Sequence, residues 1–114
     1  MDKTLIFLKH ILKSIENIEK FSKKLSKEKF SKDEFVQSAI IRQLEIIGEA
    51  VKNLPMDFTN KHSEIPWKDI AGTRDKLIHG YFGVDLDLVW GILNDNIPKL
   101  KKFILEILKD LKEK

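Results

Sequence analysis

The sequence predicts an all-α protein, an antiparallel bundle of four to five helices. Apolar residues recur every three or four positions through most of the chain, the spacing of one face of an α-helix. No segment alternates between apolar and polar residues with the two-residue period of a strand. With 114 residues, the chain is long enough for one hydrophobic core but not for a second. We therefore expect a single domain over residues 1–114.

The first helix is expected over about residues 2–25, and the second follows a connection rich in lysine and serine. Ser31 and Glu34 have the spacing of a capping box, with Phe30 and Phe35 placed as its hydrophobic staple. Pro55 should end the second helix. The first apolar stripe comprises Leu5, Leu8, Leu12, Ile15, Ile18, Phe21 and Leu25, and the second Val36, Ile40, Leu44, Ile47, Val51 and Leu54.

Residues 55–65 are expected to form a loop with one short helical turn. The third helix should begin at Pro66 and end near His79, because proline suits a first helical position and Gly80 suits a terminator. The last helix should cover about residues 85–111, interrupted near Asn94–Asn96 by Pro98. Its expected inward face comprises Leu88, Ile92, Leu100, Phe103, Ile104, Ile107, Leu108 and Leu111.

The composition excludes several classes of protein. Hydrophobic residues make up 42% and charged residues 34%, and no apolar run has the roughly 18–20 residues needed to cross a bilayer. The periodically charged start does not resemble a secretory leader, so we expect a cytoplasmic protein with no membrane partner. Cysteine is absent, which excludes disulfides and thiolate metal sites. The net charge of +3 permits nucleic-acid binding without arguing for it.

Several apolar stripes are wider than one core requires. The additional residues flank the first two stripes and widen the last one, and they are Ile6, Phe7, Ile41, Ile46 and Leu105. A second buried surface, most simply a two-fold homodimer, would account for them. The alternative is a scatter of exposed apolar side chains, which is common on soluble proteins.

Nearly all the cations are lysines, and the two arginines are Arg42 and Arg74. On the predicted third helix, Arg74 falls within an apolar sector formed by Trp67, Ile70, Ala71, Leu77 and Ile78. A guanidinium that faces a core needs a partner. It could form a structural ion pair with Glu45 or Glu49, or it could border a crevice and bind a phosphate.

His79 lies at the end of the third helix, just before Gly80. Asp75, one turn earlier, can accept a hydrogen bond from the imidazole and orient it for acid–base catalysis. The alternative is an ordinary exposed histidine, and neither His10 nor His62 has a comparable setting. Residues five apart on an ideal helix point roughly 140° away from each other. Arg74 and His79 would therefore converge only through a break at residues 72–73, uncoiling at Gly80, or a two-fold axis.

The segment AGTRDKLIHGYF contains the pattern R-x4-H-x-Y, formed by Arg74, His79 and Tyr81. This pattern resembles the motif of HEPN domains, in particular that of the HepT-like toxins. The segments AIIRQLEIIGEA, IPW and YFGVDLDLVW also stand where that family has similar residues. The resemblance thus covers about residues 5–105, and four matched segments in order are far more specific than the motif alone.

The resemblance implies a dimeric, metal-independent endoribonuclease toxin with a composite site at the dimer interface. Arg74 and His79 would be the catalytic pair, with Asp75 in support and RNA as the substrate. Tyr81 would accept AMP from a cognate MNT-type nucleotidyltransferase antitoxin; the alternative is a packing role beside Phe82. No cluster of carboxylates or histidines has metal-ligand spacing, so neither a metal nor another cofactor is expected.

Two other functions use the same residues. A non-catalytic HEPN helical module could bind a nucleotide or a nucleotidyltransferase partner through them. A purely structural bundle would have an ion-paired Arg74 and a His79 without a chemical role.

Overall fold

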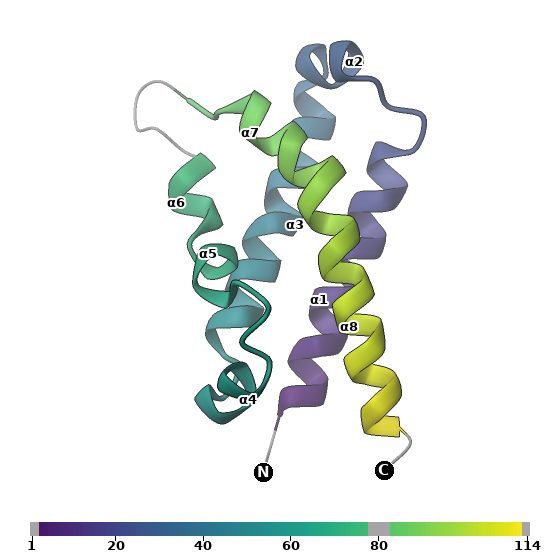
Figure 1. Cartoon of the computed structure of the whole chain (residues 1–114). Coiled ribbons are helices and arrows are strands. Elements are labelled where there is room, and N and C mark those ends of the chain that lie inside the picture. Colours follow the sequence, from purple (N-terminus) through teal and green to yellow (C-terminus); the bar gives the residue numbers. More distant parts are fainter. Residues whose placement is uncertain (1–2, 78–82, 113–114) are drawn as a thin grey trace.

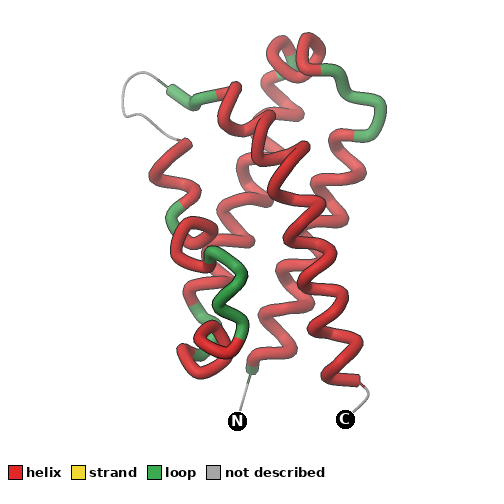
Figure 2. The backbone as a smooth tube through the Cα atoms, viewed as in Figure 1, coloured by secondary structure: helices red, strands yellow, loops and turns green. Residues whose placement is uncertain are grey.

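The computed structural model describes residues 3–77 and 83–112, and over these residues the chain is helical apart from short turns and loops (Figure 2). Helix α1 (Thr4–Ser22) runs antiparallel to α3 (Glu34–Lys52) and packs against both α3 and α8 (Ile97–Lys112) (Figure 1). The described chain starts and ends at the same end of this bundle. The predicted all-α class is confirmed.

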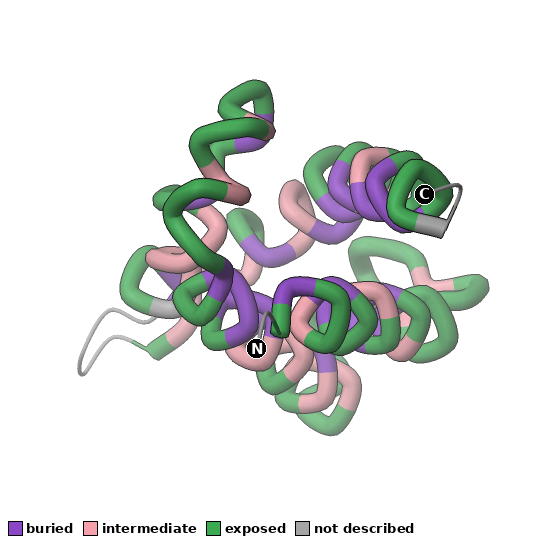
Figure 3. Tube along the Cα trace, turned by 90° about the horizontal axis from the view of Figure 1, so that it is seen from below, coloured by how far each residue is buried: buried purple, intermediate pink, exposed green. Residues whose placement is uncertain are grey.

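The core lies between the inner faces of the long helices, where the buried positions gather (Figure 3). On α1 the buried face is offset from the predicted stripe, because Leu5 and Phe21 are 42% and 38% exposed while Ile11 is fully buried. The face that α1 does bury comprises Thr4, Leu8, Ile11, Ser14, Ile15 and Ile18. These positions keep the three- and four-residue spacing of a single helix face. The helix was therefore predicted correctly, but its buried face is turned slightly from the predicted one.

The predicted start of the second helix is wrong. Residues Lys27–Lys32 form a separate short helix, α2, capped by Ser26, whose side chain accepts a hydrogen bond from the Lys29 backbone N–H at 3.1 Å. Asp33, not Ser31, caps α3, because its carboxylate accepts from the Val36 N–H at 3.1 Å. The hydroxyl of Ser31 instead donates to the Glu28 carbonyl inside α2.

The predicted staple between Phe30 and Phe35 is also absent. Phe30 is 1% exposed and lies against Trp90, with 5.4 Å between the ring centroids, whereas Phe35 is 90% exposed. Phe30 therefore joins α2 to α7 (Leu86–Gly91), two elements that contact each other.

The predicted loop over residues 55–65 contains the short helix α4 (Met56–Lys61), consistent with the expected helical turn. The predicted third helix is divided into α5 (Trp67–Ala71) and α6 (Thr73–Leu77), and Pro66 caps α5 rather than beginning it. Gly72 ends α5 by donating its N–H to the Lys68 carbonyl at 3.0 Å. The Trp67 indole donates to the His62 carbonyl at 3.0 Å and ties α5 to the end of α4.

The interruption expected before Pro98 is confirmed. A π-helical turn, η2 (Ile92–Asn96), separates α7 from α8, and the Ile97 N–H donates to the Ile92 carbonyl five residues earlier. Pro98 has no N–H for the bond that an α-helix would make to Asn94. The wider turn displaces the inward face that precedes it by one position. Val89 and Leu93 are consequently buried where the sequence predicted Leu88 and Ile92.

Several apolar side chains that exceed the needs of one core lie at the surface. Ile6 and Leu105 are 50% and 45% exposed, while Phe7, Ile41 and Ile46 are partly buried. The homodimer that they suggest stays a prediction. In the part of the chain that the structure describes, no helix combines the length and the hydropathy needed to cross a membrane.

The contrast between Phe30 and Phe35 can be tested directly. We expect Phe30→Ala to lower the free energy of unfolding by about 3–5 kcal/mol, because it leaves a cavity between α2 and α7. Phe35→Ala, the matched control, should change it by less than about 0.5 kcal/mol. Chemical denaturation followed by circular dichroism measures both values. An equal loss of unfolding free energy in the two variants would support the hydrophobic staple between Phe30 and Phe35.

Candidate functional site

The residues of the predicted site belong to α6 and to the segment that follows it. Arg74 and Asp75 lie on α6, and the side chain of Asp75 is exposed. His79 and Tyr81, with Ile78 and Phe82, lie outside the described residues, as does the side chain of Arg74. The convergence of Arg74 and His79 stays a prediction. The break at Gly72 precedes both residues, so it does not by itself change their orientation relative to each other.

The ends of the segment that carries the rest of the motif are held together. The Asp85 N–H donates to the Leu77 carbonyl at 2.9 Å, which joins the end of α6 to the start of α7. Leu77 is 1% exposed and anchors α6 in the core. The Asp85 carboxylate accepts from the Leu88 N–H at 3.0 Å and caps α7. Leu77 and Asp85 are therefore held together at one place on the bundle.

On one side of α6, Asp75 borders a polar cavity of about 350 Å³ against α3. Both candidate partners of Arg74, Glu45 and Glu49, line this cavity. Glu49 also approaches Lys52, with 3.8 Å between the carboxylate and the ammonium, but both groups are exposed and such pairs are weak. The full lining comprises Arg42, Leu44, Glu45, Gly48, Glu49, Lys52, Ala71 and Asp75.

Arg42 is a residue that the sequence identified only as the second arginine. The structure places it beside the same cavity as Asp75. The sequence spacing already indicates that these polar residues lie together, because they are three or four residues apart and share one face of α3. They are Arg42, Glu45, Glu49 and Lys52. What the sequence did not show is that α6 lies next to this face.

Gly48 sets the distance between α3 and the short helices. A Cβ atom at this position would lie 3.3 Å from the Ala71 carbonyl oxygen and 3.4 Å from that of Ile70. A larger residue would push the end of α5 away from α3. The absence of a side chain at Gly48 therefore places α6 directly over the polar cavity.

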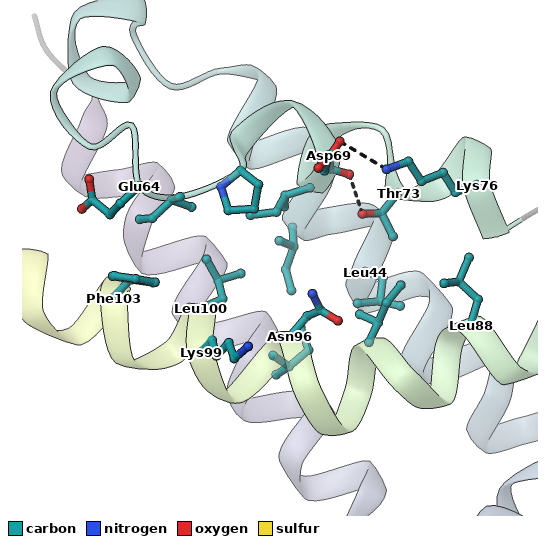
Figure 4. A pocket seen from close by; sticks show the side chains of 16 residues that line it. Leu44, Glu64, Asp69, Thr73, Lys76, Leu88, Asn96, Lys99, Leu100 and Phe103 are labelled. Atoms are coloured by element: carbon teal, nitrogen blue, oxygen red, sulfur yellow. Dashed lines mark hydrogen bonds and ion pairs between the residues drawn. The ribbon is translucent and has the colours of Figure 1, made fainter.

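A larger cavity lies on the other side of α6. It has a volume of about 480 Å³ and separates α5 and α6 from α7, η2 and α8 (Figure 4). Thr73 and Lys76 of α6 line it, and Lys76 forms an ion pair with Asp69 at 3.3 Å. The Thr73 hydroxyl donates to the Asp69 backbone carbonyl at 2.9 Å. Helix α6 thus presents Thr73 and Lys76 to one cavity and Asp75 to the other.

Within residues 3–77 and 83–112, no group of three or more histidine, aspartate or glutamate side chains is arranged to hold a metal ion. Every buried side-chain nitrogen or oxygen in the same residues has a hydrogen-bond partner. The described polar groups that remain available to a ligand are therefore at the surface and in the two cavities.

Comparison with known proteins assigns this helical domain to a class. A family model described as ribonuclease HepT-like matches residues 11–107, and the chain belongs to this family. The match contains Arg74, His79 and Tyr81, so the resemblance drawn from the motif is confirmed at the level of the family.

Named relatives agree with the family. The chain is 52% identical to a "putative RNase" of Caldanaerobacter subterraneus over 90% of its length and 92% of the relative. It is 50% identical to a "probable ribonuclease HepT" of Thermococcus cleftensis over 83% of its length and 86% of the relative. A third relative, "gamma-glutamylcyclotransferase and putative RNase" of Methanocaldococcus jannaschii, is 53% identical over 93% of the chain, which spans only 48% of that protein. No solved structure gives a significant match.

The role of Gly48 predicts a difference between two glycine-to-alanine substitutions. Gly91→Ala should raise the free energy of unfolding by about 0.5–1 kcal/mol, because no atom lies within 4 Å of the added methyl and alanine favours helix. Gly48→Ala should not raise the free energy of unfolding in this way, because the added methyl would contact the backbone of α5 too closely. Thermal unfolding compares the two, and equal stabilisation by both would show that the helices are not in close contact at Gly48.

Proposed function

We propose that this protein is a metal-independent endoribonuclease, the toxin of a toxin–antitoxin pair. The observation that carries the proposal is the ribonuclease HepT-like match over residues 11–107, which contains the R-x4-H-x-Y motif. The relatives named as ribonucleases support it, and they share 50% or more identity with the chain.

The proposed reaction is an internal transfer at phosphorus. His79 accepts the proton of the ribose 2′-hydroxyl as its oxygen bonds to phosphorus, and the imidazolium so formed gives this proton to the leaving 5′-oxygen. The P–O5′ bond breaks, leaving a 2′,3′-cyclic phosphate and a 5′-hydroxyl. Arg74 stabilises the charge on the pentacoordinate phosphate, and Asp75 supports the pair. Every proton and bond is accounted for by these side chains and the RNA.

A homodimer is part of the proposal. Five positions separate Arg74 from His79, which would direct them roughly 140° apart on a continuous helix. Two copies related by a two-fold axis could each supply part of one site without distortion of the helix. Exposed Ile6 and Leu105 provide apolar surface for such an association.

Control of the activity would act through Tyr81. We propose that an MNT-type nucleotidyltransferase antitoxin transfers AMP from ATP to the Tyr81 hydroxyl, with release of pyrophosphate. The adduct would bring a phosphodiester and a nucleoside two residues from His79. Its negative charge would compete with RNA for Arg74, and its bulk would exclude the substrate.

The nuclease assignment predicts the loss of RNA cleavage in two variants. His79→Ala should slow cleavage at least about 100-fold, because it removes the acid–base group. Arg74→Ala should slow it about 100- to 1000-fold, because it removes the stabilisation of the phosphate. Cleavage of total RNA in EDTA measures both, with thermal unfolding as the check of the fold. His10→Ala, at an exposed position, is the control and should cleave like the parent. RNA cleavage at the parental rate by both His79→Ala and Arg74→Ala would contradict the assignment of these residues to the catalytic site.

The regulatory proposal predicts a single modified residue. Incubation with ATP and the partner nucleotidyltransferase should add one AMP per chain at Tyr81, detected by mass spectrometry, and should stop RNA cleavage. Tyr81→Phe should keep its nuclease activity and remain active after the same incubation, because it lacks the acceptor hydroxyl. Inhibition of Tyr81→Phe to the same extent as the parent would contradict the switch.

A further inference from the structure

The larger cavity has the size of a small-molecule site. Its volume of about 480 Å³ lies within the range of small-molecule sites, roughly 300–1,000 Å³. Most of its wall is apolar and comes from α3, α5, α7, η2 and α8, with Leu44, Ile47, Ile70, Leu88, Ile92 and Phe103 among the lining residues. Such walls suit the faces of a flat ring.

Two polar side chains on one wall are available for recognition. The Asn96 amide and the Lys99 ammonium line the cavity, and neither forms a hydrogen bond or an ion pair within the described part of the chain. Figure 4 shows the Asn96 amide directed from its helix toward α5 and α6 across the cavity. On the opposite wall, Asp69 and Lys76 are already paired with each other. Asn96 therefore supplies a donor and an acceptor that no described residue uses.

Asn96 lies at the end of the π-helical turn. Asn96 is the last residue of η2, and the next residue, Ile97, is 5% exposed and packs in the core. Asn96 and Ile97 both line the cavity, so a polar residue lies there beside a buried one. Single π-helical turns within α-helices occur frequently at functional sites.

The cavity borders α6, the helix that carries Arg74 and Asp75 of the motif. Thr73 and Lys76, which line it, flank Arg74 and Asp75 on α6. Leu88, which also lines it, lies on α7, at the other end of the segment that contains His79 and Tyr81. A nucleotide bound beside α6 would therefore have this cavity within reach.

We propose that the cavity binds a purine base of single-stranded RNA, with adenine preferred, and that Asn96 determines this specificity. Proteins that read RNA sequence insert unstacked bases into such sites and bind their polar edges. An asparagine amide matches the adjacent donor and acceptor of adenine, N6 and N7. Lys99 would contact the phosphate of the same nucleotide. The inference rests on the part of the proposed function that has this protein bind RNA, and it concerns binding and not the cleavage step.

The test measures binding without cleavage. Uncleavable 2′-O-methyl oligonucleotides containing only A, G, C or U are titrated into the full chain, and affinity is measured by fluorescence anisotropy at one salt concentration. The parent should bind oligo(A) tightest. Asn96→Ala should weaken oligo(A) binding about tenfold and leave oligo(C) and oligo(U) unchanged. Asn94→Ala is the matched control: it lies on the same turn, its amide bonds to the Trp90 carbonyl, and it does not line the cavity.

A second variant tests the cavity itself. Leu88→Trp fills the space from a side chain that is 37% exposed, so the core should be unaffected. It should weaken purine binding while the melting temperature stays near that of the parent. Binding of oligo(A) at parental affinity by this variant would overturn the proposal.

The other outcomes separate the two proposals. If the parent cleaves RNA but Asn96→Ala keeps the same base preference, the cavity is not a base site and the nuclease proposal stands. If oligo(A) binding depends on Asn96 but the parent never cleaves, the base site stands and the nuclease proposal fails. If the parent binds none of the oligonucleotides, or if Asn96→Ala alters only the association of two chains, the base site is overturned.

Discussion

Helix α3 is the element on which the rest of the structure depends, because its opposite faces serve two different neighbours. One face buries Ile40 and Ile47 in the core, on the side of α1. The other carries the polar series that begins at Arg42 and lies beneath α6. Gly48 lies where α5 approaches most closely, and its lack of a side chain brings the motif-bearing helix onto this second face. Folding of the core and placement of the site are therefore coupled through one helix.

The two cavities give the short helix α6 a particular role. Its five residues, Thr73–Leu77, separate a polar space beside α3 from a mostly apolar space beside α7 and α8. A phosphodiester and a base have opposite requirements: the first needs charged groups and the second needs apolar walls. Because both environments lie beside one turn of helix, an RNA strand could satisfy both requirements in adjacent nucleotides. This arrangement connects the proposed chemistry with the proposed specificity.

Much of the fold could be predicted from the sequence, and the errors have local causes. The helical class follows from periodicity, and the interruption near Asn94–Asn96 follows from the missing N–H of Pro98. The start of α3 was placed two residues early because Ser31 and Asp33 are both good capping residues, and it is Asp33 that caps the helix. The inward face of the last helix was displaced by one residue in the part before the π-helical turn, because this turn changes the period.

The candidate site was predictable in its motif and not in its surroundings. Arg74, His79 and Tyr81 are recognisable as a pattern within one short segment. Arg42 and Asn96, by contrast, acquire meaning only from cavities whose walls come from parts of the chain far apart in sequence. Neither residue has a local signal that distinguishes it from an ordinary polar residue on a helix surface.

The small size of α5 and α6 has a consequence for how this protein can change. Helices of five residues are too short to persist in isolation, so their order derives from contacts with α3 and from a few bonds such as that between Leu77 and Asp85. Their opening would leave most of the buried core of α1, α3 and α8 intact. Opening of α5 and α6 can thus occur at a lower free-energy cost than unfolding of the whole domain.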